Sequence, residues 1–162
     1  MLRGALAPIW ETVVFVLASG LLSFFVGQAL PRRWFDFNAF PYRDFPWEDG
    51  GRVYSRLNVR AWKDKLPDMS RIMPFVVKKK ALLARTPEAM ARLIRETCVA
   101  EIVHWGLIVL MSPVLAVWQG GVRGALFALF YAAGNLLFII IQRYNRPRLK
   151  EVLRRMEGRR AD

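Results

Sequence analysis

Three long stretches of the chain are apolar and almost free of charged residues, and this pattern restricts the possible folds more than any other feature. They cover approximately Thr12–Leu30, Ile102–Val122 and Gly124–Arg143. Each is close to the roughly 20 residues that an α-helix needs to cross about 30 Å of hydrocarbon. The sequence therefore predicts an all-α membrane protein with three transmembrane helices, built as a single membrane domain over residues 1–162.

The first stretch invites comparison with a secretory signal peptide, because it is N-terminal and follows Arg3. It is longer than the apolar core of a typical signal peptide, and it ends in Gln28-Ala29-Leu30-Pro31 in place of a small-residue cleavage site. We therefore expect an uncleaved first span over residues 12–30, with a cleaved signal peptide as the alternative.

Basic residues indicate the orientation of the spans. Residues 31–98 carry 15 Lys/Arg against 8 Asp/Glu, and residues 142–162 carry 8 against 3. Because cytoplasmic segments are enriched in Lys and Arg, both segments are expected in the cytoplasm, and the turn at residues 119–124 and the N-terminus outside. This predicts a multi-pass protein of the bacterial inner membrane with a cytoplasmic basic loop and C-terminus.

The formal net charge of +12 also raises the question of nucleic-acid binding. No helix-turn-helix, zinc-finger or RNA-recognition pattern is visible, and the charge flanks the spans, so we expect no nucleic-acid partner. Anionic lipid headgroups are the expected counter-charge. Cys98 is the single cysteine, which excludes an intrachain disulfide, and no Cys/His pair has metal-ligand spacing. We expect neither a bound metal nor a cofactor.

The segment between the first two spans, residues 31–85, is predicted to lie at the cytoplasmic membrane interface. Residues 34–47 contain seven aromatic side chains, which favours an interfacial anchor, with an aromatic lip for a lipid chain as the alternative. Residues 52–84 alternate apolar and basic residues, which is typical of a basic amphipathic segment on the inner leaflet. The Lys78–Lys80 run is expected to be a solvated or phosphate-facing surface.

Thr86-Pro87-Glu88 combines a hydroxyl N-cap, proline at the first helical position and an acid in the first turn. It predicts a helix over residues 86–118 that enters the second span. The glycine-rich turn at residues 119–124 then predicts a helical hairpin with the third span over residues 122–142, followed by a basic tail over residues 143–162.

Glu101 and His104 stand three residues apart and share one helix face inside the second span. With equal helical rise in both arms of the hairpin, opposed positions sum to about 240, which places His104 level with Leu136 and beside Asn135. A polar cluster is therefore predicted toward the cytoplasmic end of the spans. Its members are Glu101, His104, Asn135, Gln142, Arg143, Asn145 and Arg146.

This cluster contains the groups that general-base acyl transfer requires. An imidazole can take a hydroxyl proton, a carboxylate can orient it, and amide or guanidinium donors can stabilise an oxyanion or bind a phosphate. The alternative is that the polar side chains only hold the helices together by hydrogen bonds.

Three stretches carry a family resemblance: Val59–Asp68, Ile94–Trp105 and Gly134–Leu149. In these stretches, within about residues 55–150, the chain resembles the glycosyl-4,4'-diaponeurosporenoate acyltransferase family of bacterial membrane proteins. The first span and the aromatic stretch are similar only in general character. The resemblance implies transfer of a fatty acyl group onto a sugar hydroxyl, at glucosyl C6, of a carotenoid-like isoprenoid glycoside or another glycolipid.

On positions that match these stretches, we predict His104 as the catalytic base and Glu101 as the carboxylate that orients it. An acyl-CoA-like donor is the expected co-substrate and a glycolipid the acceptor. The predicted substrate-binding residues are Trp62, Lys63, Trp105, Asn135, Gln142, Arg143, Asn145 and Arg146. The alternative from another functional class is a non-enzymatic membrane scaffold or anionic-lipid-binding protein. Three spans leave little room for a closed cavity, so a homodimer is also considered.

Overall fold

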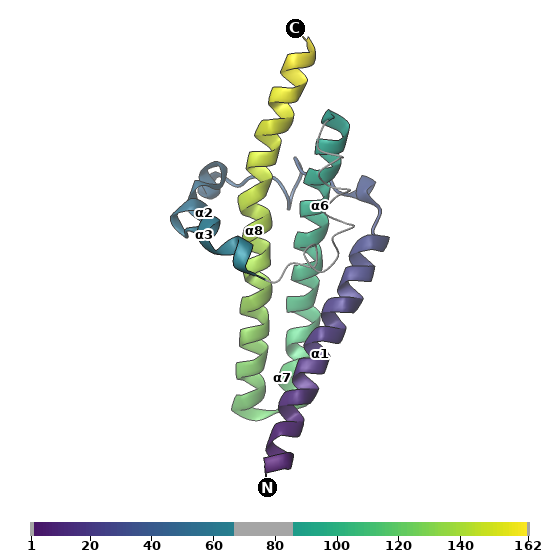
Figure 1. Ribbon diagram of the computed structural model, residues 1–162, viewed down its shortest axis with the longest axis vertical. Helices are drawn as coiled ribbons and strands as arrows, with labels where there is room; N and C mark the ends of the chain where they lie inside the picture. The colour runs from purple at the N-terminus through teal and green to yellow at the C-terminus, as the bar shows by residue number, and fades with distance from the viewer. Residues whose placement is uncertain (1, 67–85, 162) are drawn as a thin grey trace. The chain divides into compact units, whose positions relative to one another are not determined.

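The computed structural model describes residues 2–66 and 86–161, and regular structure in this part of the chain is entirely helical. The α-helices are α1 (Leu2–Ala29), α2 (Arg52–Arg56), α3 (Val59–Trp62), α6 (Pro87–Gly106), α7 (Ser112–Gln119) and α8 (Gly121–Ala161) (Figure 1). Short 3₁₀ turns lie at Arg32–Trp34, Pro46–Gly51 and Lys63–Lys65, and a π-helical turn at Leu107–Met111 joins α6 to α7.

The three predicted spans are confirmed as helices. Segments Ile9–Ala29, Pro87–Gln119 and Gly121–Arg159 are each long and apolar enough to cross a bilayer. Large apolar side chains point outward from them, among them Leu17 and Phe130, which are 68% and 72% exposed. Because water would not favour such exposure, these surfaces suit contact with lipid chains.

The second span begins where the sequence indicates. Helix α6 starts at Pro87, and the Ala89 backbone N–H donates to Thr86 Oγ1 at 3.2 Å, which confirms Thr86 as the N-cap. The third helix includes the predicted third span and extends beyond it. Helix α8 continues without a break to Ala161, so the basic tail is helical, with Arg154 and Arg155 both paired to Glu151 one turn earlier.

The chain divides into two compact units. The first contains residues 1–30 and 100–139, and the second contains residues 31–99 and 140–162. Helices α6 and α8 therefore contribute residues to both units.

The first unit contains the predicted helical hairpin. Gly120 and Gly121 adopt positive φ angles of 67° and 53°, which glycine tolerates without strain, and they reverse the chain between α7 and α8. A β-carbon at Gly124 would clash with the carbonyl oxygen of Ala116, so glycine at this position allows the two helices to approach closely. The predicted hairpin is therefore confirmed.

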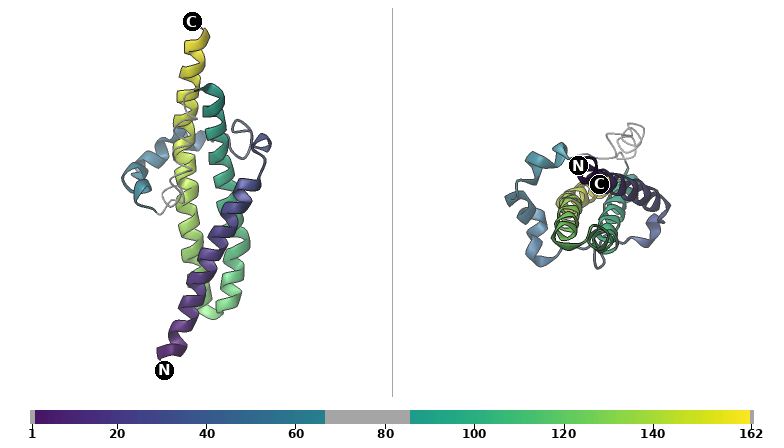
Figure 2. Two further views of the ribbon diagram at one scale, coloured as in Figure 1. Left: turned by 45° about the vertical axis from the view of Figure 1, so that its right-hand side comes forward. Right: turned by 90° about the horizontal axis from the view of Figure 1, so that it is seen from below.

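Helix α1 lies alongside α7 in both views of Figure 2 and is attached to the hairpin by polar contacts. Gln119 Nε2 donates to Thr12 Oγ1 at 2.9 Å, and Ser19 Oγ lies 3.0 Å from the Tyr131 hydroxyl. These hydrogen bonds satisfy side chains that would otherwise be costly in an apolar environment.

In the second unit the aromatic stretch and the short helices pack on the C-terminal part of α8. Tyr54, Val59 and Tyr144 form one buried cluster. Phe35 is buried, whereas Trp34, Phe40 and Trp47 are 66%, 75% and 62% exposed. The aromatic stretch thus supplies core residues as well as exposed rings suited to an interfacial anchor. Of the predicted amphipathic segment at 52–84, residues 52–66 form two short helices and turns, and the remainder, including Lys78–Lys80, lies outside the described residues.

Candidate active site

His104 lies on α6 within the first unit and contacts α8. Its Nδ1 atom is 2.9 Å from Asn135 Oδ1, and its ring stacks on Phe138 with the ring centroids 4.9 Å apart and the planes at 5°. The predicted position of His104 beside Asn135 is therefore confirmed. The polar pair and the stacked ring hold the imidazole in one orientation.

The hydrogen bonds of Asn135 assign the protonation of the His104 ring. Asn135 Nδ2 donates to the Tyr131 carbonyl oxygen at 2.9 Å, which fixes the amide so that Oδ1 faces the imidazole. A carbonyl oxygen can only accept, so His104 Nδ1 must carry the hydrogen. In the neutral ring the lone pair is then on Nε2, which is the nitrogen able to take a proton from a hydroxyl group.

Glu101 is placed one turn before His104 on α6 and is 2% exposed. The neighbouring Trp105 is 42% exposed. Asn135, predicted to bind substrate, is the residue whose hydrogen bond orients the imidazole. The proposed action of Glu101 on His104 stays a prediction.

In the second unit, Arg143 and Glu48 form an ion pair that is almost shielded from solvent. Arg143 Nη1 lies 3.2 Å from both carboxylate oxygens of Glu48, with the side chains 11% and 3% exposed. Arg143 Nη2 donates to the Pro41 carbonyl at 2.5 Å, and its guanidinium lies 4.9 Å from the Phe45 ring centroid. Tyr54 completes the group with a 2.5 Å hydrogen bond from its hydroxyl to Glu48 Oε1. This arrangement attaches the aromatic stretch to α8.

Arg146 is buried, at 1% exposure, and bonds to two separate segments of the second unit. Its Nε and Nη2 atoms donate to the side-chain and backbone oxygens of Thr97 at 2.9 and 3.2 Å. Its Nη1 atom donates to the Tyr42 carbonyl at 2.9 Å. Arg146 therefore joins α6 and α8 to the aromatic stretch, and its predicted contact with an acyl donor stays untested.

The remaining predicted substrate-binding residues belong to the second unit. Trp62 is half-buried, and its indole N–H donates to the Leu57 carbonyl at 3.0 Å. Lys63 pairs with Asp64 at 3.2 Å, and Gln142 and Asn145 are half-buried on α8. In the first unit, by contrast, the structure brings two predicted site residues, His104 and Asn135, into direct contact.

Sequence reasoning missed Glu48, Tyr42 and Thr97, which hold the two arginines. Glu48 stands directly after Trp47 in the aromatic stretch, and a carboxylate that is buried requires a cationic partner, but Asp36, Asp44 and Asp49 lie nearby and nothing in the sequence shows which acid is buried. The partner of Glu48 stands 95 residues later along the chain, so spacing offers no indication of which arginine it is.

Comparison with known proteins identifies the family. The model of the glycosyl-4,4'-diaponeurosporenoate acyltransferase family matches residues 31–155, more than half of the chain. The chain belongs to this family. The match begins earlier than the expected 55–150 and includes the aromatic stretch, so Glu48 and Arg143 fall inside it, as do His104 and Asn135.

Two proteins named glycosyl-4,4'-diaponeurosporenoate acyltransferase illustrate the relationship of this family member to its relatives. That of Staphylococcus aureus strain N315 is 29% identical over 136 residues, which cover 83% of this chain and 81% of the relative. That of strain Newman is 30% identical over 141 residues, covering 85% and 84%. No solved structure matches this acyltransferase family member.

Proposed function

We propose that the protein is a membrane-bound acyltransferase that moves a fatty acyl group onto a sugar hydroxyl of a glycosylated isoprenoid. Family membership supports acyl transfer, and the names of the relatives support an acceptor of the carotenoid-glycoside type. The observation that carries a catalytic role is the His104–Asn135 hydrogen bond, because it leaves Nε2 as the basic nitrogen.

The proposed reaction uses an acyl thioester of the acyl-CoA type. His104 Nε2 takes the proton of the sugar hydroxyl as its oxygen attacks the thioester carbonyl. The tetrahedral intermediate collapses to the ester and expels the thiolate, which receives the proton from the imidazolium. Asn135 Oδ1 accepts the Nδ1 hydrogen throughout, and the buried Glu101 carboxylate is proposed to favour the transient positive charge.

The test of this function compares two acceptors that differ only in the sugar. The purified protein in lipid nanodiscs receives radiolabelled acyl-CoA with either a glycosylated carotenoid acid or the same carotenoid acid without its sugar. We expect an alkali-labile acylated product from the glycoside and none from the aglycone. Equal labelling of both acceptors would exclude the sugar hydroxyl, and no labelling of either would favour the scaffold hypothesis.

The role of Asn135 is tested by two substitutions that differ in hydrogen bonding. Asn135→Ala removes the acceptor for Nδ1–H, and we expect kcat to fall on the order of 10- to 100-fold with little change in KM, because the imidazole loses its orientation. Asn135→Asp keeps an acceptor oxygen and is expected to retain most of the activity. Equal losses in both variants would contradict a positioning role.

We also propose that the protein is a multi-pass protein of the inner membrane with its basic segments in the cytoplasm. The test places single cysteines at Val122, which is 79% exposed beside the hairpin turn, and at Glu157 near the end of α8, in a Cys98→Ala background. A membrane-impermeant maleimide should label Val122→Cys in intact spheroplasts and Glu157→Cys only after lysis. The reverse pattern would show the opposite orientation.

A further inference from the structure

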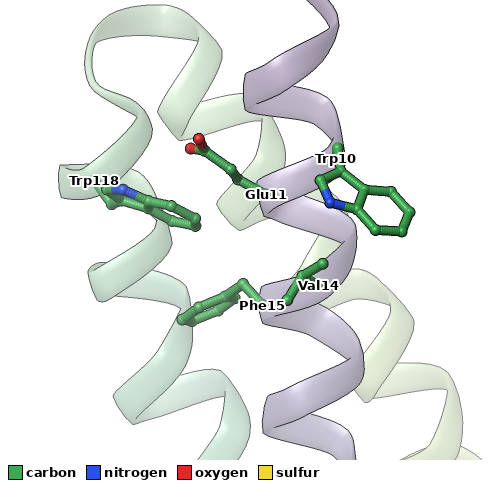
Figure 3. A pocket seen from close by; sticks show the side chains of 5 residues that line it. All are labelled: Trp10, Glu11, Val14, Phe15 and Trp118. Carbon is green, nitrogen blue, oxygen red and sulfur yellow. The ribbon is translucent and has the colours of Figure 1, made fainter.

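A hollow of about 360 Å³ lies on the first unit, apart from the residues assigned to acyl transfer. Figure 3 shows that α1 and α7 supply its walls, and its lining residues are Trp10, Glu11, Val14, Phe15 and Trp118. Its volume is at the lower end of the range for small-molecule sites. Four of the five lining side chains are apolar or aromatic, and the fifth is a carboxylate.

The position of the hollow along the spans indicates which part of a lipid molecule lies beside it. The first span begins at Ile9 and the second ends at Gln119, so Glu11 and Trp118 lie near span ends. The hydrogen bond between Thr12 and Gln119 shows that these two ends are level with each other. Tryptophan is enriched at this depth, where the apolar chains give way to the lipid headgroups. The hollow therefore faces headgroups.

The walls of the hollow are held in place before any ligand arrives. The ring centroids of Phe15 and Trp118 are 5.7 Å apart, and those of Phe15 and Tyr131 are 6.4 Å apart. The Thr12–Gln119 hydrogen bond also attaches α1 to the end of α7. Such prior ordering lowers the entropy cost of binding.

The chemistry of the lining selects a cation. The Glu11 carboxylate is exposed, and Figure 3 shows it on the side of α1 that faces Trp118, with the Trp10 ring on the other side of the α1 ribbon. The electron-rich faces of indole rings attract ammonium groups, and an adjacent carboxylate adds a charge of the opposite sign. The same carboxylate repels anionic headgroups. Trp118 is 47% exposed, so its ring is accessible to a ligand.

We propose that this hollow binds the ammonium headgroup of a membrane lipid such as phosphatidylethanolamine. The ammonium lies against Glu11 and the indole ring of Trp118, and the acyl chains follow the exposed apolar side chains of α1, such as Val14 and Leu17. The proposal is independent of acyl transfer, because it involves neither His104 nor Asn135.

The test measures lipid binding by native mass spectrometry of the delipidated protein. Phosphatidylethanolamine and phosphatidylglycerol with identical acyl chains are titrated separately. We expect the protein to bind phosphatidylethanolamine about three- to tenfold more tightly, and Glu11→Gln to remove this preference. Glu157→Gln, which changes an exposed acid on α8, is the matched control and should keep the preference. Equal affinities of the unmodified protein for both lipids would overturn the proposal.

A second variant and a soluble competitor separate the possible explanations. Trp118→Leu keeps an apolar side chain but lacks the aromatic face, so it should lower the preference for phosphatidylethanolamine while leaving phosphatidylglycerol binding unchanged. Free ethanolamine should not displace the lipid at equal concentration, because it lacks the chains that pack along α1. Displacement by ethanolamine would show an ammonium site that does not select a lipid, and retention of the full preference in both variants would exclude the hollow.

Discussion

His104→Ala is expected to lower the rate of acyl transfer about 10²- to 10⁴-fold, which is the usual contribution of a positioned general base. The variant loses the Nε2 lone pair that accepts the hydroxyl proton, while the rest of the first unit keeps its helical contacts. The measurement is the initial rate of labelled-product formation from radiolabelled acyl-CoA and the glycosylated acceptor, at matched amounts of folded protein.

Two further variants test whether the loss of activity is due to the imidazole itself. His104→Gln retains a polar side chain that can bond to Asn135 but has no basic nitrogen, so its rate should fall as far as that of His104→Ala. Val114→Ala shortens a side chain that is 49% exposed on α7 and should keep the normal rate. Normal activity in a folded His104→Gln protein would remove His104 from the reaction.

The neighbourhood of His104 could be predicted because few variables determine it. A tight glycine turn fixes where the two arms of the hairpin begin. The prediction assumed the same rise per residue in both arms, and the π-helical turn at Leu107–Met111 did not move His104 away from Asn135. The register therefore placed His104 beside Asn135, and the structure joins them by a hydrogen bond. What the register could not supply was the direction of the Asn135 amide, because that depends on its bond to the Tyr131 carbonyl.

The second unit could not be predicted in the same way. Its aromatic stretch has no helical or strand periodicity, and its conformation depends on contacts with residues about 100 positions later, such as Arg143 with Pro41. The sequence indicated an interfacial anchor, and the exposed Trp34, Phe40 and Trp47 suit that prediction. The buried Phe35 and Glu48 show that the same stretch also forms a core.

The charge of the arginines after the third span favoured a membrane anchor, and it was the family resemblance that favoured binding of the acyl donor. Neither of these two signals reveals whether an arginine is buried. Arg143 and Arg146 instead make extensive contacts inside the second unit. Arginines that appear equivalent in the sequence can therefore differ in how deeply they are buried. The side chain of Arg155, on the same helix, is 73% exposed and pairs with the nearby Glu151. The difference in burial between Arg146 and Arg155 makes their alanine substitutions a matched pair.

Arg146→Ala is expected to lower the free energy of unfolding by about 2–4 kcal/mol, because it removes charged hydrogen bonds to Thr97 and Tyr42 and leaves buried oxygens without those donors. Arg155→Ala should change it by less than about 0.5 kcal/mol, as expected of an exposed ion pair. The measurement is thermal unfolding in detergent, followed by tryptophan fluorescence.

The Michaelis constant for acyl-CoA separates a structural role of Arg146 from donor binding. Arg146→Lys keeps the charge but cannot reach all three acceptor oxygens, so it should be destabilised by an intermediate amount. If Arg146 is structural, the folded fraction of Arg146→Lys should have an unchanged KM for acyl-CoA at a temperature well below its unfolding transition. A KM raised tenfold or more with unfolding behaviour unchanged would instead assign Arg146 to the donor. Because Arg146 is 1% exposed and its guanidinium forms hydrogen bonds through three nitrogens, we expect the first result.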